Sequence, residues 1–66
     1  MALVNLDIPS YIGRSYRTRD GRIVRVIAPQ GNSMVLVRDH NGKEWYASAY
    51  RVRDALKARE VFPHKE

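Results

Sequence analysis

Two stretches of the chain are rich in Val, Ile, Tyr and Trp, and each is interrupted by a short turn signal. The turn signals are Asp20-Gly21 and Asn41-Gly42. Both dipeptides favour the two-residue type I′ turn of a β-hairpin, in which both central residues have positive φ. The flanking residues are those that strands prefer. The pattern predicts an antiparallel meander made of hairpins 15–28 and 34–48, joined by a loop over 29–33.

A two-residue turn fixes the register of the first hairpin. Counting outward from Asp20-Gly21 places Arg19 opposite Arg22 and Arg17 opposite Val24. Directly opposed residues share a face of the sheet, so three arginines are expected on one side of this hairpin tip. Like charges opposed across strands destabilise a sheet, and an anionic partner would relieve that cost. A tip whose arginines extend into water fits the same pattern.

The same counting in the second hairpin places Arg38 opposite Trp45 and Val37 opposite Tyr46. Arg38 is then expected to make a cation–π contact with the indole. Consecutive strand residues point to opposite faces, so Trp45 and Tyr46 cannot both lie in the core. We expect Trp45 to be the more buried of the two and Tyr46 to be the exposed aromatic.

The N-terminal residues are expected to form an extended arm across the sheet, because Pro9 interrupts any strand there. Its apolar side chains are Leu3, Leu6, Ile8 and Ile12.

The segment after Ser48 fits two interpretations. Ser48 is a suitable cap for a helix that carries Val52 on its apolar face. Alternatively, Asp54 caps a shorter helix, 55–60, which follows a fifth strand over 51–53. Val52 lies between two arginines and alternates as a strand does, so the second interpretation is favoured.

These elements together predict one mainly β domain, a small antiparallel barrel of four or five strands with a short C-terminal helix. Closure would remove the exposed edges of so small a sheet. The strand and turn rhythm of YRTRDGRIVRV (16–26) and VLVRDHNGKEWY (35–46) resembles the SH3-like barrels of the Tudor and KOW type. That resemblance implies a module that binds RNA, DNA or peptides. The expected parts are an N-terminal arm (1–13), the barrel core (14–54), the helix (55–61) and a tail (62–66).

The charge of the chain narrows the kind of partner. The net charge is +5, from 12 basic and 7 acidic residues. Nearly all of the excess lies between Arg14 and Arg25, where five arginines accompany one aspartate. The planar guanidinium suits bidentate contacts with phosphates or carboxylates.

Composition also argues against several classes of protein. The chain has no cysteine and two histidines, so we expect neither a metal site nor a cofactor. Secreted domains of this size usually need disulfides, which favours the cytoplasm, and no apolar run is long enough to cross a membrane. The first seven residues do not resemble a signal peptide. No serine has a histidine and a carboxylate nearby in the sequence, so no catalytic residues are expected and the chain is not expected to be an enzyme.

We therefore expect a basic binding module whose partner is DNA or RNA. The candidate binding residues are six arginines and one aromatic: Arg14, Arg17, Arg19, Arg22, Arg25, Arg38 and Tyr46. The alternative is a protein-interaction or regulatory accessory module, of the kind that phages and plasmids encode, which docks on a larger acidic protein. The sequence leaves a homodimer open.

Overall fold

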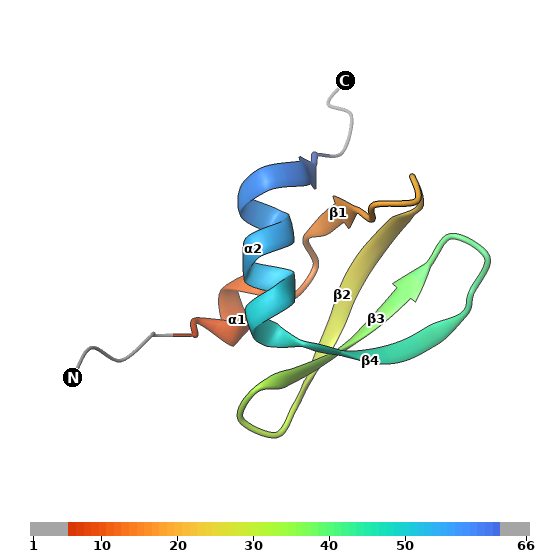
Figure 1. Ribbon diagram of the computed structural model, residues 1–66. Coiled ribbons are helices and arrows are strands. Elements are labelled where there is room, and N and C mark those ends of the chain that lie inside the picture. Colours follow the sequence, from red (N-terminus) through yellow and green to blue (C-terminus); the bar gives the residue numbers. More distant parts are fainter. Residues whose placement is uncertain (1–5, 63–66) are drawn as a thin grey trace.

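The computed structural model describes residues 6–62, in which five antiparallel strands form one sheet against two helices (Figure 1). Neither of these helices combines the length and the apolar character needed to cross a membrane. Along the chain the elements are α1 (Ile8–Tyr11), β1 (Ser15–Arg17), β2 (Ile23–Gln30), β3 (Met34–Asp39), β4 (Glu44–Ser48), α2 (Ala49–Arg59) and β5 (Glu60–Val61).

The strands lie in the order β4-β3-β2-β1-β5. The mainly β class, the meander and the short C-terminal helix are confirmed. The predicted closure of the sheet is wrong, because β4 and β5 form opposite edges and do not pair. Instead, α2 connects these two edge strands and packs on one face of the sheet (Figure 1). The helix buries the face that closure would otherwise have buried.

The C-terminal helix begins at Ala49 and has Ser48 as its cap, as in the interpretation that the sequence favoured less. The Ser48 hydroxyl accepts a hydrogen bond from the Tyr50 backbone N–H at 3.2 Å, which caps the first turn. Val52 is 1% exposed as a helical residue, so the predicted strand over 51–53 is wrong. Asp54 lies within the helix and pairs with Arg53 instead of capping it. The fifth strand exists further on, as β5, where it pairs with β1.

The core lies between α2 and one face of the sheet, which we call the inner face. Four valines of β2 and β3 alternate onto this face and are at most 1% exposed: Val24, Val26, Val35 and Val37. They pack against the apolar stripe of α2, which is Ala49, Val52, Ala55 and Leu56. We call the opposite face, on which neither α1 nor α2 packs, the outer face.

The N-terminal segment forms a helical turn rather than the predicted extended arm. Pro9 is in the first turn of α1, where its missing N–H costs no hydrogen bond. Ile8 and Tyr11 are buried in the core, and Leu6 and Ile12 pack against it. The prediction for Leu3 lies outside the described residues.

Both hairpin turns are one residue longer than predicted. In the first, the Thr18 N–H donates to the Arg22 carbonyl at 2.7 Å, and the Gly21 N–H donates to the Thr18 carbonyl at 3.0 Å. This is a type I turn followed by Gly21 at φ +93°. Among residues 6–62 only glycines have positive φ, which excludes the predicted type I′ turn.

The longer turn shifts the first hairpin by one residue. Val24 lies opposite Tyr16 on the inner face, whereas the sequence predicted Arg17 at that position. Arg17 consequently lies opposite Ile23 on the outer face, the face that Arg25 also occupies.

The second hairpin shows the same shift. Asp39 and Lys43 flank its three-residue loop, in which Gly42 has φ +88°. Trp45 lies opposite Val37 on the inner face, and Tyr46 lies opposite Leu36 on the outer face. The connection between the hairpins is also shorter than predicted. Pro29 and Gln30 extend β2 and pair with β3, so the loop covers 31–33 rather than 29–33.

Candidate nucleic-acid interface

A row of charged side chains crosses the outer face near the turn between β3 and β4. Arg25 of β2 lies directly opposite Arg38 of β3, and Arg38 lies directly opposite Glu44 of β4. Arg38 Nη2 is 2.6 Å from Glu44 Oε2, which gives this guanidinium a counter-ion. Arg25 has no carboxylate within 4 Å among the described residues, and its one hydrogen bond, to the Gly13 carbonyl, is long at 3.5 Å. The exposed Arg25 guanidinium is therefore available to an anion.

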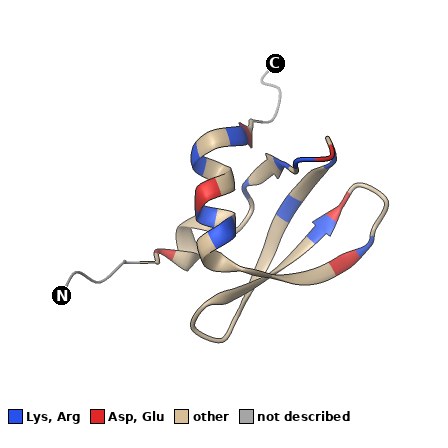
Figure 2. Cartoon of the chain, viewed as in Figure 1, with Lys and Arg blue, Asp and Glu red and all other residues tan. Residues whose placement is uncertain are grey.

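Arg17 adds a second cation on the same face. It lies on β1 diagonally to Arg25, a relationship that places Cα atoms about 7–8 Å apart. Its Nη1 donates to the Gly21 carbonyl at 3.1 Å, and no carboxylate in residues 6–62 pairs with it. Basic positions on the adjacent strands β2 and β3 are visible in Figure 2.

The outer face is hollowed where these arginines lie. A hollow of about 300 Å³ is lined by Ser15, Ile23, Val24, Arg25, Ile27, Arg38, Asp39 and His40. A second hollow, of about 270 Å³, is lined by Gly13, Arg14, Ser15, Ile23, Arg25, Glu60, Val61 and Phe62. The two hollows share Ser15, Ile23 and Arg25 in their lining, so they adjoin on the outer face, and we call the two together the outer groove.

Exposed aromatic rings lie toward both edges of the outer face. Tyr46 of β4 is 57% exposed and lies opposite Leu36, beside the row of charges. Phe62 follows β5, lines the second hollow and is 73% exposed. Trp45 is half-buried against the core, so the prediction that Tyr46 is the exposed member of the pair is confirmed.

Arg14 lines the outer groove but already has a partner. Its Nε and Nη2 donate to the two oxygens of Glu60, at 2.9 and 2.7 Å. This bidentate pair holds the loop before β1 against β5. The hydrogen bonds from Arg14 lower the pKa of Glu60, and the same pair raises the pKa of Arg14.

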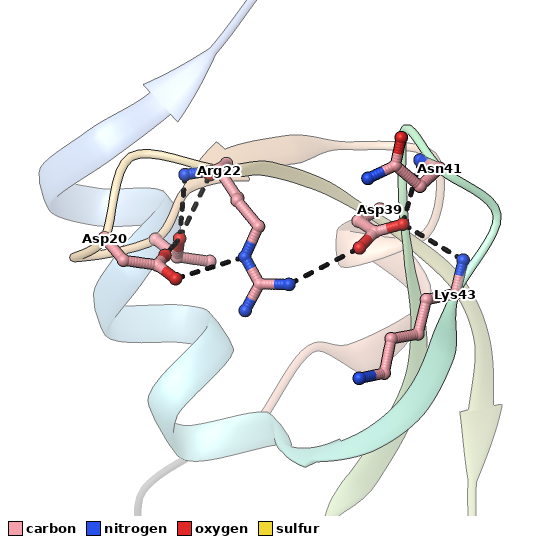
Figure 3. A network of polar contacts seen from close by, with 6 residues as sticks. Asp20, Arg22, Asp39, Asn41 and Lys43 are labelled. Atoms are coloured by element: carbon pink, nitrogen blue, oxygen red, sulfur yellow. Dashed lines mark hydrogen bonds and ion pairs between the residues drawn. The ribbon is translucent and has the colours of Figure 1, made fainter.

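Arg22 does not join the other arginines, because the shifted register turns it away from the outer face. Its guanidinium lies between Asp20, at 3.1 Å, and Asp39, at 3.5 Å (Figure 3). It also lies over the Trp45 ring, 5.7 Å from the centroid. The predicted cation–π contact between Arg38 and Trp45 is therefore wrong, and Arg22 occupies that position.

Asp39 connects the two hairpin turns. It is 4% exposed, and its Oδ1 accepts the backbone N–H groups of Asn41 and Lys43, at 2.9 and 3.0 Å. Its Oδ2 faces Arg22 (Figure 3). The opposition of Asp39 and Glu44 that a two-residue turn would give does not occur. These contacts assign Asp39 and Arg22 a structural role.

The structure therefore divides the predicted binding residues into groups. It brings Arg17, Arg25, Arg38 and Tyr46 together on the outer face, and it places Arg14 at one end of the groove. Arg19 is exposed at the tip of the first turn, beyond the last pair of β1 and β2. Sequence reasoning missed the apolar lining and the far end of the groove, which are Ile23, Ile27, His40 and Phe62. Ile23 and Ile27 alternate with the buried valines of β2, and the correct register would have placed them on the outer face.

The chemistry of this surface is that of binding. It offers guanidinium groups for phosphates or carboxylates, and apolar and aromatic side chains for flat apolar groups. Within residues 6–62 no three His, Cys, Asp or Glu side chains gather as metal ligands would. No family model matches the sequence, and no curated protein or solved structure matches it either.

Proposed function

We propose that the protein is a small SH3-like module that binds nucleic acid through its outer face. The observation that carries this proposal is the opposition of Arg25 and Arg38, in which Arg25 has no carboxylate partner among the described residues. Two like charges directly opposed across strands cost stability. Phosphate groups bound between the guanidinium groups would offset that cost and release condensed counter-ions from the nucleic acid.

The position of the cations supports the same function. Arg17, Arg25 and Arg38 lie on three consecutive strands of the face that carries no helix. A nucleic acid strand lying across this face would meet them in succession. The absence of cysteine supports a cytoplasmic site of action, where nucleic acids are available.

The second candidate is a protein-interaction module with an acidic partner. Exposed Tyr46 and Phe62 favour it, because aromatic residues and arginine are enriched at protein interfaces. The dependence of affinity on salt distinguishes nucleic-acid binding from binding to an acidic protein. Each phosphate contact contributes about −0.7 (single strand) to −0.9 (duplex) to the slope of log K against log salt.

The test compares two double variants with equal loss of charge. R17A/R25A removes the two outer-face arginines that pair with no carboxylate in the described part of the chain, and R51A/K57A removes two exposed cations from α2. Affinity for a labelled oligonucleotide is measured by anisotropy over a series of salt concentrations. We expect R17A/R25A to weaken binding and to flatten the salt slope by up to about 1.4–1.8. R51A/K57A should change both the affinity and the slope much less. Equal effects of the two variants, or no binding by the wild type at low salt, would refute the proposal.

A further inference from the structure

We infer that the outer groove binds single-stranded nucleic acid, with one base seated in the 300 Å³ hollow and neighbouring bases stacked on the exposed aromatic rings. The inference rests on the proposed function and names its substrate class. It comes from the shape and the apolar character of the groove, whereas the proposed function comes from its charge.

The shape of the outer face disfavours a duplex. Direct readout of B-DNA usually requires an α-helix or a two-stranded ribbon that projects into the major groove. The outer face has the opposite form, with two adjoining hollows that share Ile23 and Arg25 in their lining. The longer described helix, α2, packs on the inner face. A hollowed face suits bases that are already unstacked and free to turn toward the protein.

The lining of the 300 Å³ hollow is suited to a nucleic-acid base. Ile23 and Ile27 both line this hollow and provide apolar surface. His40 provides a polar ring at the edge. The guanidinium planes of arginines can stack on bases as well as contact phosphates, so Arg25 and Arg38 can serve both purposes.

Two exposed aromatics add flat apolar surface to the outer face, Phe62 within the lining of the second hollow and Tyr46 outside both hollows. Phe62 lies at the β5 side of the outer groove and Tyr46 on β4, at the other edge of the sheet. Aromatic platforms combined with a basic groove are the usual means of binding single strands without strict sequence preference. Neighbouring strands are about 4.8 Å apart, so β5 and β4 are separated by roughly 19 Å, and only a few nucleotides can contact the face at once.

The experiment compares a labelled dT12 with the dT12·dA12 duplex of the same length, using the full chain at low salt. The variants are Y46A on the outer face and Y50A on α2, a matched control because Tyr50 is also well exposed and also lies beside an arginine. We expect the wild type to prefer dT12. We expect Y46A to weaken dT12 binding about 5- to 150-fold, the equivalent of one lost stacking contact, with an unchanged salt slope. Y50A should bind as the wild type does.

The possible results test the single-strand inference and the proposed function separately. If the duplex binds at least as tightly as dT12 and R17A/R25A still flattens the slope, this inference fails and the proposed function stands. If Y46A and Y50A have equal effects on dT12 binding while circular dichroism shows both folded, the stacking surface is refuted. If Y46A does not fold, F62A takes its place, with the same loss expected. If neither nucleic acid binds, both claims fall.

Discussion

Arg25 on β2 and Arg38 on β3 lie directly opposite one another on the outer face, and within residues 6–62 only Arg38 has a carboxylate beside it. Cross-strand pairs are the unit from which a sheet gains or loses stability, and a like-charge pair is unfavourable. The thin core of a 66-residue chain leaves little stability to spare. The pair therefore links the stability of the free protein to its proposed binding.

Removal of one charge of this pair should stabilise the fold and weaken binding. R25T replaces the arginine with a good strand former and ends the repulsion, so we expect a gain of about 0.2–1 kcal/mol at low salt. The gain should shrink as salt screens the charges. Thermal unfolding followed by circular dichroism measures it. R17T, which is opposite the uncharged Ile23, is the control and should give a smaller gain. A loss of stability in R25T at low salt would contradict the account.

Removal of the Glu44 carboxylate beside Arg38 should strengthen the binding of nucleic acid. Glu44 holds the Arg38 guanidinium at 2.6 Å, and E44Q removes that competing charge. We expect up to about 5-fold tighter binding to an oligonucleotide, since an exposed ion pair is worth at most about 1 kcal/mol. D54N on α2 makes the same change of charge next to Arg53 and serves as the control. If D54N strengthens binding as much as E44Q does, net charge is responsible rather than Arg38.

The pair of Arg14 and Glu60 should make stability depend on acid pH. Hydrogen bonds from Arg14 lower the pKa of Glu60 in the folded state below its ordinary value of 4.5. A carboxyl with a lowered folded-state pKa binds fewer protons than in the unfolded chain. Its contribution is therefore complete above pH 4.5 and is lost as the pH falls from there through the lowered value.

Urea unfolding of the wild type and E60Q at a series of pH values measures this contribution. The difference in unfolding free energy between the two should narrow below pH 4.5. Some acid dependence should remain in E60Q, because a hydrogen bond from the Thr18 hydroxyl lowers the pKa of Asp20 from 3.8. A constant difference down to pH 2 would mean that the Arg14 contact is not formed in solution.

The conformation of the turn between β3 and β4 predicts different losses of stability for substitutions at Gly42 and at Asn41. Gly42 has φ +88°, and a Cβ added there would meet no atom within 4 Å. G42A should therefore cost roughly 1–2 kcal/mol from backbone strain alone. Asn41 does not have positive φ, so N41A should change stability by no more than about 0.5 kcal/mol. Chemical denaturation measures both, and an equally large cost for N41A would instead indicate a type I′ turn.

The meander was predicted correctly from the sequence, but the register of both hairpins was predicted wrongly. Asp-Gly and Asn-Gly fit a two-residue turn and also a three-residue loop that ends on glycine, and the two differ by one residue. A shift of one residue moves every side chain to the other face. This is why Arg22 lies over Trp45, and why Arg17 lies with Arg25 rather than with Arg22.

The ends of the chain were harder to predict for a different reason. Ser48 and Asp54 are both good helix caps, and local alternation around Val52 favoured the wrong one. Burial of Ala49 and Leu56 against the sheet decides for the longer helix, and that packing is not visible in local sequence. Strand alternation correctly separated Tyr46 from Trp45, but alternation does not decide which of the two is exposed. The valines of β3 lie on the same face as Trp45, and the burial of that face leaves Tyr46 exposed.

The most direct test of nucleic-acid binding by the outer face is a ¹H–¹⁵N chemical-shift titration of the labelled protein with unlabelled dT12 at low salt. We expect the largest chemical-shift changes in the amide signals of Arg17, Arg25, Arg38 and Tyr46 and in the guanidinium signals of these three arginines. Signals of Arg51 and Lys57, on the exposed side of α2, should stay nearly constant. Shifts confined to α2, or none at all at millimolar oligonucleotide, would contradict the account.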